Sequence, residues 1–327
     1  MDQAIKKVDR KIEEVLGGSL SSSLMELYNG SGLKDGKRLR AKLFLAFAGT
    51  ESDKTIDTAC SIELLHSATL IHDDVLDNSS TRRGRSALYR NHGIPESILY
   101  GDYVFTEAFK LISTLKDPVI MCEITSALSE VLKGELTEQK RKGDISLSRK
   151  EYLNIIKMKS GCLLGVSAKL GALMMEDKKL NSEKAYRFGI KFGIAYQMID
   201  DYIDYFGTGK GKEIYGDIKE GVVTLPLISL IEKCSYKERR VILSHLKKKT
   251  EAIQKILELM DVYGIAAGVL GEVDKHLEET KELFDGEVYK ETNCYFDILL
   301  WIKEKIDNAR KEYHNSRRRV CRSCNQF

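Results

Sequence analysis

The chain has 327 residues, of which 43% are hydrophobic and 31% are charged, so it carries enough apolar sequence for a buried core. Its formal net charge is only +3 at pH 7, and this balance does not itself indicate a nucleic-acid partner. Length alone would permit two domains, but no Pro- or Ser-rich linker interrupts the helical periodicity, and strand signals are scarce. We therefore expect an all-α protein with a single domain over residues 1–327, ending in a solvated basic tail at about 314–327.

The N-terminal segment and the cysteines give information about the cellular compartment of the protein. Residues 1–14 are charged and amphipathic and do not look like a secretory signal. The seven cysteines lie mostly in apolar helical segments, a usage that favours reduced thiols. Cys321 and Cys324 form a C-x-x-C pair without a second ligand pair, which argues against a zinc site. No apolar run is long enough to span a membrane. We expect a soluble, cytoplasmic protein.

A basic segment, DGKRLR, occupies residues 35–40. Lys37 and Arg40 are three residues apart and would project from the same side of a helix. A glycine before a helix start permits close backbone approach, and cations beside a helix N-terminus favour phosphate binding. Taken alone, such a segment is more often a solvated basic turn.

A first aspartate motif, DDVLD, occupies residues 73–77 and follows an apolar helix predicted over residues 64–71. Asp73 and Asp77 share one helical face, and His66, two turns earlier, shares it as well. Mg²⁺ prefers carboxylate oxygens and takes its remaining ligands from water and substrate phosphates, so Asp73, Asp74 and Asp77 are candidate metal ligands. For His66, an ordinary structural role and a phosphate contact are equally open.

A second motif of the same form, DDYID, occupies residues 200–204 and follows a second apolar helix. One such motif is usually a solvated acidic face. Two motifs at the ends of apolar helices need compensating cations, so Asp200, Asp201 and Asp204 are candidate ligands too. The two motifs together would hold several Mg²⁺ ions around one diphosphate.

Further basic and polar residues accompany both motifs. Arg82 and Arg83 follow the first motif closely enough to meet a phosphate bridged by its metal ion, and arginine suits phosphate by its bidentate geometry. Gln197 lies one turn before Asp200. Lys212 lies in a glycine–lysine segment that lacks the spacing of a nucleotide P-loop. We interpret that segment as a flexible basic loop that closes over a bound diphosphate.

Five segments, in order, resemble the trans-isoprenyl diphosphate (polyprenyl) synthase family from about Asp35 to Pro226: DGKRLRA, HDDVLDNSSTRRG, KSGCLLG, GIAYQMIDDYIDYFG and GKEIYGDIKEGVVTLP. The resemblance implies an isoprenoid-synthase helical bundle around a deep central cavity, usually as a homodimer. It also implies condensation of isopentenyl diphosphate with allylic prenyl diphosphates, with at most peripheral membrane contact when the product leaves.

Carried over by position, the resemblance assigns contacts to isopentenyl diphosphate to Lys37, Arg40, His66 and Arg83. It assigns contacts to the allylic diphosphate to Arg82, Lys159, Ser160, Gln197 and Lys212. Asp73 and Asp77, with Asp74, would bind two Mg²⁺ ions, and Asp200, with Asp201 and Asp204, a third. The expected catalytic residues are Asp73, Asp77, Asp200, Lys159 and Lys212. The chain departs from the family pattern at Asp35, Ala41 and Val222; the last of these stands where many members have a lysine.

Product length is predicted from Ala68 and Thr69, about one turn before Asp73. Small side chains here indicate an open tunnel and a trans-polyprenyl product of C20 or longer, since relatives that stop at C15 often have an aromatic residue at this place. In the alternative interpretation, both residues simply pack against a neighbouring helix and another bulky group ends the chain early.

Other functions are weighed against this one. A short-chain synthase making farnesyl or geranylgeranyl diphosphate is the nearest alternative. A class I terpene cyclase would share one aspartate motif but would not need Lys37, Arg40 or the Arg82–Arg83 pair. A non-catalytic partner subunit would be expected to lose a motif, and both are intact. An RNA-binding helical protein would show aromatics interleaved with basic patches, a pattern that is absent from the sequence.

Overall fold

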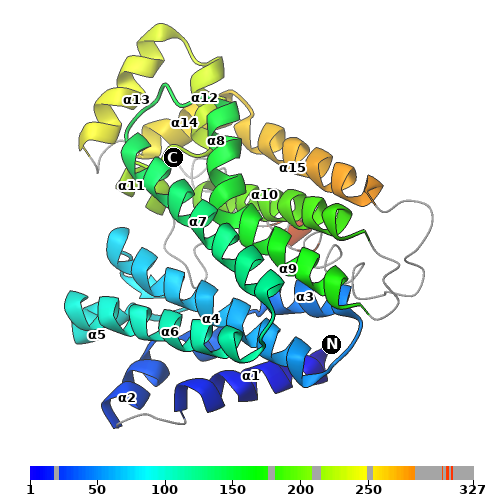
Figure 1. Cartoon of the computed structure of the whole chain (residues 1–327). Coiled ribbons are helices and arrows are strands. Elements are labelled where there is room, and N and C mark those ends of the chain that lie inside the picture. The colour runs from blue at the N-terminus through cyan, green and yellow to red at the C-terminus, as the bar shows by residue number, and fades with distance from the viewer. Residues whose placement is uncertain are drawn as a thin grey trace. The chain divides into compact units, whose positions relative to one another are not determined.

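The computed structural model describes residues 1–17, 22–175, 181–207, 215–248 and 253–283, together with residues 304, 307, 308 and 311. The regular secondary structure of these residues is helical (Figure 1), apart from one pair of two-residue strands, and this confirms the predicted all-α class. The elements in chain order are α1 (Asp2–Gly17), α2 (Ser22–Gly30), η1 (Leu33–Asp35), α3 (Leu39–Ala48), α4 (Asp53–Leu76), β1 (Thr81–Arg82), β2 (Arg85–Ser86), α5 (Leu88–His92), α6 (Ile94–Thr114), α7 (Pro118–Arg141), α8 (Arg149–Ile156), η2 (Lys157–Gly161), α9 (Cys162–Met174), α10 (Ser182–Phe206), α11 (Gly216–Glu220), α12 (Leu225–Lys233), α13 (Tyr236–Lys248), α14 (Ile253–Val262) and α15 (Ile265–Glu282).

Local chemistry explains several helix starts. Pro95, Pro118 and Pro226 all lie in the first turn of a helix, where a missing backbone N–H breaks no intrahelical bond. The side chain of Ser52 accepts the backbone N–H of Thr55 and caps α4. Among the described helices, none is long and apolar enough to cross a bilayer.

The described chain divides into two compact units. Unit 1 contains residues 1–129 and 163–189, and unit 2 contains residues 130–162 and 190–283. The divisions after residues 129 and 189 fall inside α7 and α10, so no linker marks them. The single-domain organisation of the chain stays a prediction.

Unit 1 is built around α4, which packs against α6, α1 and α3 (Figure 1). Most of α4 is buried, and the helix runs for 24 residues without glycine or proline. Gly101 allows α6 to approach α4 closely, because a Cβ at this position would lie 2.3 Å from Nε2 of His72. This close packing fixes the helix whose last turn carries the first aspartate motif.

Unit 2 contains α8, the part of α10 from residue 190 onward, α12, α14 and α15, and α12 contacts α8, α14 and α15. Arg149 in the first turn of α8 joins three side chains of α12 and α15: Ser229, Glu232 and Glu272. Ser148 and Glu151 form a reciprocal capping box at the start of α8. The position of α8 within unit 2 is therefore fixed at its N-terminal end.

Candidate active site

The first aspartate motif lies at the C-terminal end of α4 in unit 1. Asp77 is the C-terminal capping residue, and its backbone N–H donates to the carbonyl of Asp73 over 2.9 Å. Asp73 and Asp77 are therefore one turn apart, and both are half-buried. Asp74 differs, since its residue exposure is only 5%.

Asp74 is bound by Arg82. Nε of Arg82 donates to Oδ1 of Asp74 over 2.7 Å, and a second guanidinium N–H reaches the same oxygen. Burial raises the pKa of Asp74, against the opposing hydrogen bond and charge of Arg82. The pair ties the strand after the motif to the helix that carries it, so Asp74 has a structural partner within the chain.

A two-residue turn presents Arg83. Strands β1 and β2 pair antiparallel, and Arg83 and Gly84 between them both have positive φ, of 54° and 77°. Such a turn matches the twist of the strands but is strained at a non-glycine residue. Nη1 of Arg83 donates to the carbonyl of Gly32 over 2.9 Å and holds this conformation.

The basic segment 37–40 lies in the same unit. Lys37 is exposed and Arg40 is half-buried. Arg38 between them is 4% exposed, has a φ of 52°, and donates through Nε to Asp9 of α1 over 2.7 Å. Neither Arg38 nor Asp9 could be predicted from the sequence, because nothing in the local pattern indicates that an arginine in this segment is buried.

His66 lies near these cations. Burial and the positive charges of Arg40, Arg83, Arg82 and Arg38 hold the pKa of His66 well below its ordinary value. Glu63, one turn earlier in α4 and 3% exposed, accepts the backbone N–H of Ala41 over 2.9 Å and so fixes the first turn of α3. Unit 1 thus gathers a neutral histidine and four arginines, which together favour a bound anion.

The second aspartate motif lies near the end of α10 in unit 2. Asp200 is half-buried, whereas Asp201 and Asp204 are 5% and 7% exposed. Asp204 accepts the backbone N–H groups of Gly216 and Asp217 over 3.0 and 3.2 Å. It therefore caps α11, across the segment that contains Lys212. Lys212 itself lies outside the described residues.

Asp201 accepts hydrogen bonds on both oxygens. Tyr152 donates to Oδ2 over 2.6 Å, and Nε2 of Gln197 donates to Oδ1 over 2.8 Å. Oε1 of Gln197 accepts the hydroxyl of Ser160 over 2.6 Å. Burial raises the pKa of Asp201 to about 7, against the opposing effect of these two donors. The structure thus joins three predicted site residues, Ser160, Gln197 and Asp201, in one chain of hydrogen bonds.

Lys159 lies in η2, a π-helical turn between α8 and α9, a deviation frequently found at functional sites. Its Nζ contacts Oε2 of Glu135 at 2.9 Å and also pairs with Glu138. Burial lowers the pKa of Lys159, but the charges of the two glutamates more than offset this and raise the pKa above its ordinary value. Lys159 is therefore a fixed cation.

The residues predicted to set product length are both in α4. Ala68 has no exposed surface, while Thr69 is half-buried and donates its hydroxyl to the carbonyl of His66 over 2.8 Å. Val222, which replaces a common lysine, is 8% exposed. Product length stays a prediction, and Thr69 is the more accessible of the two positions.

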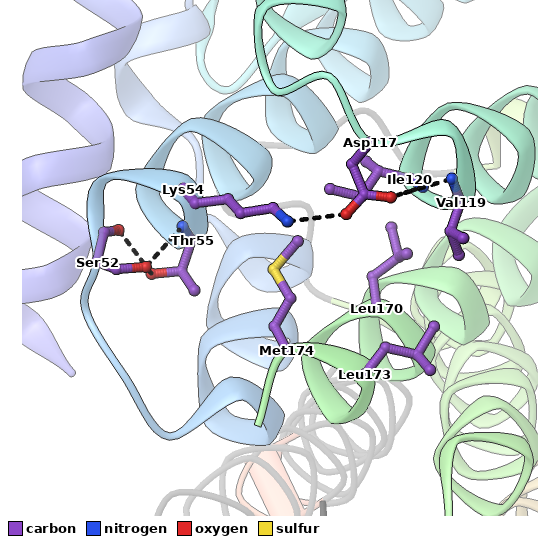
Figure 2. A pocket seen from close by; sticks show the side chains of 9 residues that line it. All are labelled: Ser52, Lys54, Thr55, Asp117, Val119, Ile120, Leu170, Leu173 and Met174. Atoms are coloured by element: carbon purple, nitrogen blue, oxygen red, sulfur yellow. Dashed lines mark hydrogen bonds and ion pairs between the residues drawn. The ribbon is translucent and has the colours of Figure 1, made fainter. Parts of the chain in front are cut away.

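A separate cavity of about 200 Å³ lies in unit 1, at the N-terminal end of α4. Figure 2 shows Lys54 and Asp117 facing each other across it, with Nζ and Oδ2 2.8 Å apart, beside Leu170 and Met174. Asp73 lies eighteen positions along the helix from Thr55 in the lining of this cavity, which corresponds to about 27 Å. None of the predicted site residues lines this cavity.

Comparison with known proteins places these residues in a family context. The family model described as Polyprenyl synthetase matches residues 22–263, which include both aspartate motifs. The chain is 32% identical over 237 residues to geranylgeranyl pyrophosphate synthase of Geoglobus acetivorans, covering 70% of this chain and 74% of that protein. It is 30% identical to octaprenyl diphosphate synthase of Haemophilus influenzae, covering 69% of this chain and 70% of that protein.

A solved structure is similar over nearly the whole length. The polyprenyl synthase of Caulobacter crescentus CB15, complexed with calcium and isoprenyl diphosphate, matches with a TM-score of 0.84 at 27% identity and covers 94% of each chain. These findings confirm the family resemblance that the motifs indicated, and with it the predicted isoprenoid-synthase fold class.

Proposed function

The chain belongs to the polyprenyl synthetase family and is a prenyltransferase, and we propose that it condenses isopentenyl diphosphate with allylic prenyl diphosphates in a Mg²⁺-dependent reaction. The observation that carries this proposal is the presence of two intact aspartate motifs in the sequence, together with the arginine cluster around His66 in unit 1. We further propose trans products of C20 or longer, which rests on the small residues Ala68 and Thr69.

We propose Asp73, Asp77 and Asp200 as the principal metal ligands. Within the described residues, no group of three or more His, Cys, Asp or Glu side chains could hold a metal ion alone. Mg²⁺ usually keeps several waters and takes few protein carboxylates beside substrate phosphates, so this donor set fits the ion. The predicted ligands Asp74, Asp201 and Asp204 all accept hydrogen bonds within the chain and would act mainly by orienting their neighbours.

The ion in the Caulobacter relative is calcium. For this chain, Mg²⁺ and a count of three ions per site rest on the family resemblance and on the carboxylate donors. When bound, Mg²⁺ would supply positive charge that stabilises the departing diphosphate.

The basic residues would divide between the two substrates. Lys37, Arg40, His66 and Arg83 would hold isopentenyl diphosphate; His66, kept neutral by its neighbours, would contribute a hydrogen bond rather than a charge. For the allylic diphosphate the proposed contacts are Arg82, Lys159, Ser160, Gln197 and Lys212. Because Glu135 and Glu138 already hold Lys159, its ammonium group would be in place before substrate arrives.

The chemistry assigned to these residues is a substitution at carbon. The C–O bond of the allylic diphosphate breaks, the double bond of isopentenyl diphosphate attacks the allylic carbon, and one proton is lost to the departing diphosphate. Lys159 and Arg82 would stabilise the negative charge that develops on the leaving group. Lys37 and Arg40 would orient isopentenyl diphosphate so that its double bond faces the allylic carbon, where positive charge develops as the diphosphate leaves.

Assembly and location are also proposals. A homodimer and a cytoplasmic location follow from the family resemblance and the cysteine pattern. Among the described residues, Cys60, Cys122, Cys162 and Cys234 form no disulfide, which supports a reducing environment. We propose that the protein has no nucleic-acid partner and that it contacts a membrane only peripherally, as the product leaves.

Replacing Lys37 or Arg40 with alanine should raise KM for isopentenyl diphosphate roughly ten- to a hundredfold, since each change removes a charge-assisted contact. KM for the allylic substrate should change little. Steady-state assays with labelled isopentenyl diphosphate would measure both constants. Lys34→Ala, an exposed lysine paired with Glu13, is the matched control and should leave both constants unchanged. Equal increases in the two KM values would contradict the division of the basic residues.

Replacing Thr69 with phenylalanine should shorten the product toward C15 without abolishing condensation, because the ring would enter the path proposed for the growing chain. Thr69→Val, which keeps the volume, should leave product length unchanged. Ala68→Phe should also shorten the product, but Ala68 has no exposed surface, so overpacking should destabilise the fold by about 1–3 kcal/mol. Chromatography of the dephosphorylated products would measure the chain length that each variant makes. A wild-type protein whose longest product is C15 would contradict the prediction of an open tunnel.

A further inference from the structure

Tyr152 in α8 is a buried residue that directly contacts the second aspartate motif. Tyr152 is only 2% exposed, and its hydroxyl donates to Oδ2 of Asp201 over 2.6 Å. Asp201 is 5% exposed. A buried carboxylate needs donors on its oxygens, because an oxygen left without one keeps the full penalty of its desolvation. Tyr152 supplies the donor for one of the two oxygens.

The other oxygen of Asp201 begins a chain of hydrogen bonds. Gln197 donates to Oδ1 over 2.8 Å through its amide nitrogen, so the amide oxygen faces the opposite way and accepts from Ser160 over 2.6 Å. Asp201 can only accept hydrogen bonds when it is ionised, and in that state this sets which end of the Gln197 amide faces it. The orientation of Asp201 therefore determines the orientation of Gln197, and through it that of the Ser160 hydroxyl.

The position of Tyr152 is fixed from the opposite side. Its backbone N–H donates to the carbonyl of Ser148 over 2.9 Å, within the capped first turn of α8. Arg149 in the same turn binds Glu232 of α12 and Glu272 of α15. The tyrosine hydroxyl is thus presented by a turn that is held at several points, rather than by a flexible loop.

We propose that Tyr152 is a positioning residue for diphosphate binding at the second aspartate motif, acting through Asp201. It would hold Asp201 as a fixed acceptor, and Asp201 would in turn orient Gln197 and Ser160 toward the substrate. Partners of this kind orient the groups that contact a metal or substrate and are worth about ten- to a hundredfold in affinity. This inference rests on the proposed function, which places Asp200, Gln197 and Ser160 at the allylic diphosphate.

The test compares Tyr152→Phe with the wild-type chain in calorimetric titrations with inorganic diphosphate in the presence of Mg²⁺. The variant keeps the ring and removes only the hydroxyl, and we expect Kd to rise about tenfold. In steady-state assays KM for the allylic diphosphate should rise by a similar factor, while KM for isopentenyl diphosphate should stay unchanged. Tyr100→Phe is the matched control: Tyr100 is 1% exposed, and the described residues offer its hydroxyl no hydrogen-bond partner.

Asp200→Ala, measured in the same titration, distinguishes a failure of the role proposed for Tyr152 from a failure of the proposed function. If Asp200→Ala loses diphosphate binding and Tyr152→Phe binds as the wild type does, the role of Tyr152 is wrong and the proposed function stands. If neither variant affects binding, the assignment of the second motif to diphosphate fails. A Tyr152→Phe protein that loses thermal stability or fails to fold, without a selective change in allylic binding, would show a purely structural role and overturn the inference.

Discussion

Alanine at Asp73 or at Asp200 is expected to lower kcat by about 10³-fold or more, while the far-UV helical signal stays unchanged. Each change removes a proposed Mg²⁺ ligand, and the charge that a metal ion provides to a leaving diphosphate is among the largest single contributions to such a reaction. Both carboxylates are half-buried, so their removal should not disturb the core. The measurement is initial-rate condensation at saturating substrates and Mg²⁺.

Two controls belong to that experiment. Asp53→Ala removes an exposed carboxylate from the opposite end of α4 and should leave kcat unchanged. EDTA should abolish activity in the wild-type chain, and added Mg²⁺ should restore it. Near-normal turnover in either Asp73→Ala or Asp200→Ala would contradict the metal assignment.

Lys159→Ala should lower the free energy of unfolding by about 3 kcal/mol, because it leaves two carboxylates without their shared cation. The side chains of Glu135 and Glu138 are 12% and 17% exposed, so water cannot readily replace the ammonium group. Urea unfolding followed by circular dichroism would measure the change. The same substitution should also impair use of the allylic diphosphate.

A rescue variant separates stability from substrate binding. Adding Glu138→Gln to Lys159→Ala removes one of the stranded charges and should recover part of the lost stability, but it should not recover allylic binding. Lys191→Ala is the control: its ion pair with Glu279 involves side chains that are 32% and 39% exposed, and such pairs contribute less than about 1 kcal/mol. Equal destabilisation by Lys159→Ala and Lys191→Ala would mean that the cluster around Lys159 has no special importance.

Features set by neighbouring residues could be predicted from sequence. The scarcity of strand signals predicted the all-α class, and the i, i+4 spacing of the aspartates predicted the one-turn relation of Asp73 and Asp77 that the structure shows. The small β1–β2 pair was not predicted, since two-residue strands leave almost no periodic signal.

Partners distant in sequence could not be predicted. Tyr152 and Asp201 are 49 residues apart, Lys159 and Glu138 are 21 apart, and Arg38 and Asp9 are 29 apart. Each pair forms only when separate helices pack, and a tyrosine or a glutamate on a helix has many possible environments. The sequence therefore supplied charged candidates for the chemistry, which stay predictions, but it did not indicate the residues that orient them.

The hydrogen-bond partners found in the structure change the interpretation of the aspartate motifs. The sequence placed all six aspartates among the candidate metal ligands, with Asp74, Asp201 and Asp204 as helpers of Asp73, Asp77 and Asp200. In the structure, Asp74, Asp201 and Asp204 accept hydrogen bonds from Arg82, from Tyr152 and Gln197, and from the first turn of α11. Within each motif, buried aspartates fix the backbone and neighbouring side chains, and the half-buried aspartates are the better candidates for contact with metal ions.

The most direct test of the proposed function is a condensation assay with product sizing. The purified chain would be incubated with labelled isopentenyl diphosphate, Mg²⁺ and, in separate reactions, dimethylallyl, geranyl, farnesyl and geranylgeranyl diphosphates. We expect trans-prenyl diphosphates of C20 or longer, formed only when both substrates and the metal ion are present. Cyclic hydrocarbons formed from an allylic diphosphate alone, or no consumption of isopentenyl diphosphate with any primer, would contradict the proposed reaction.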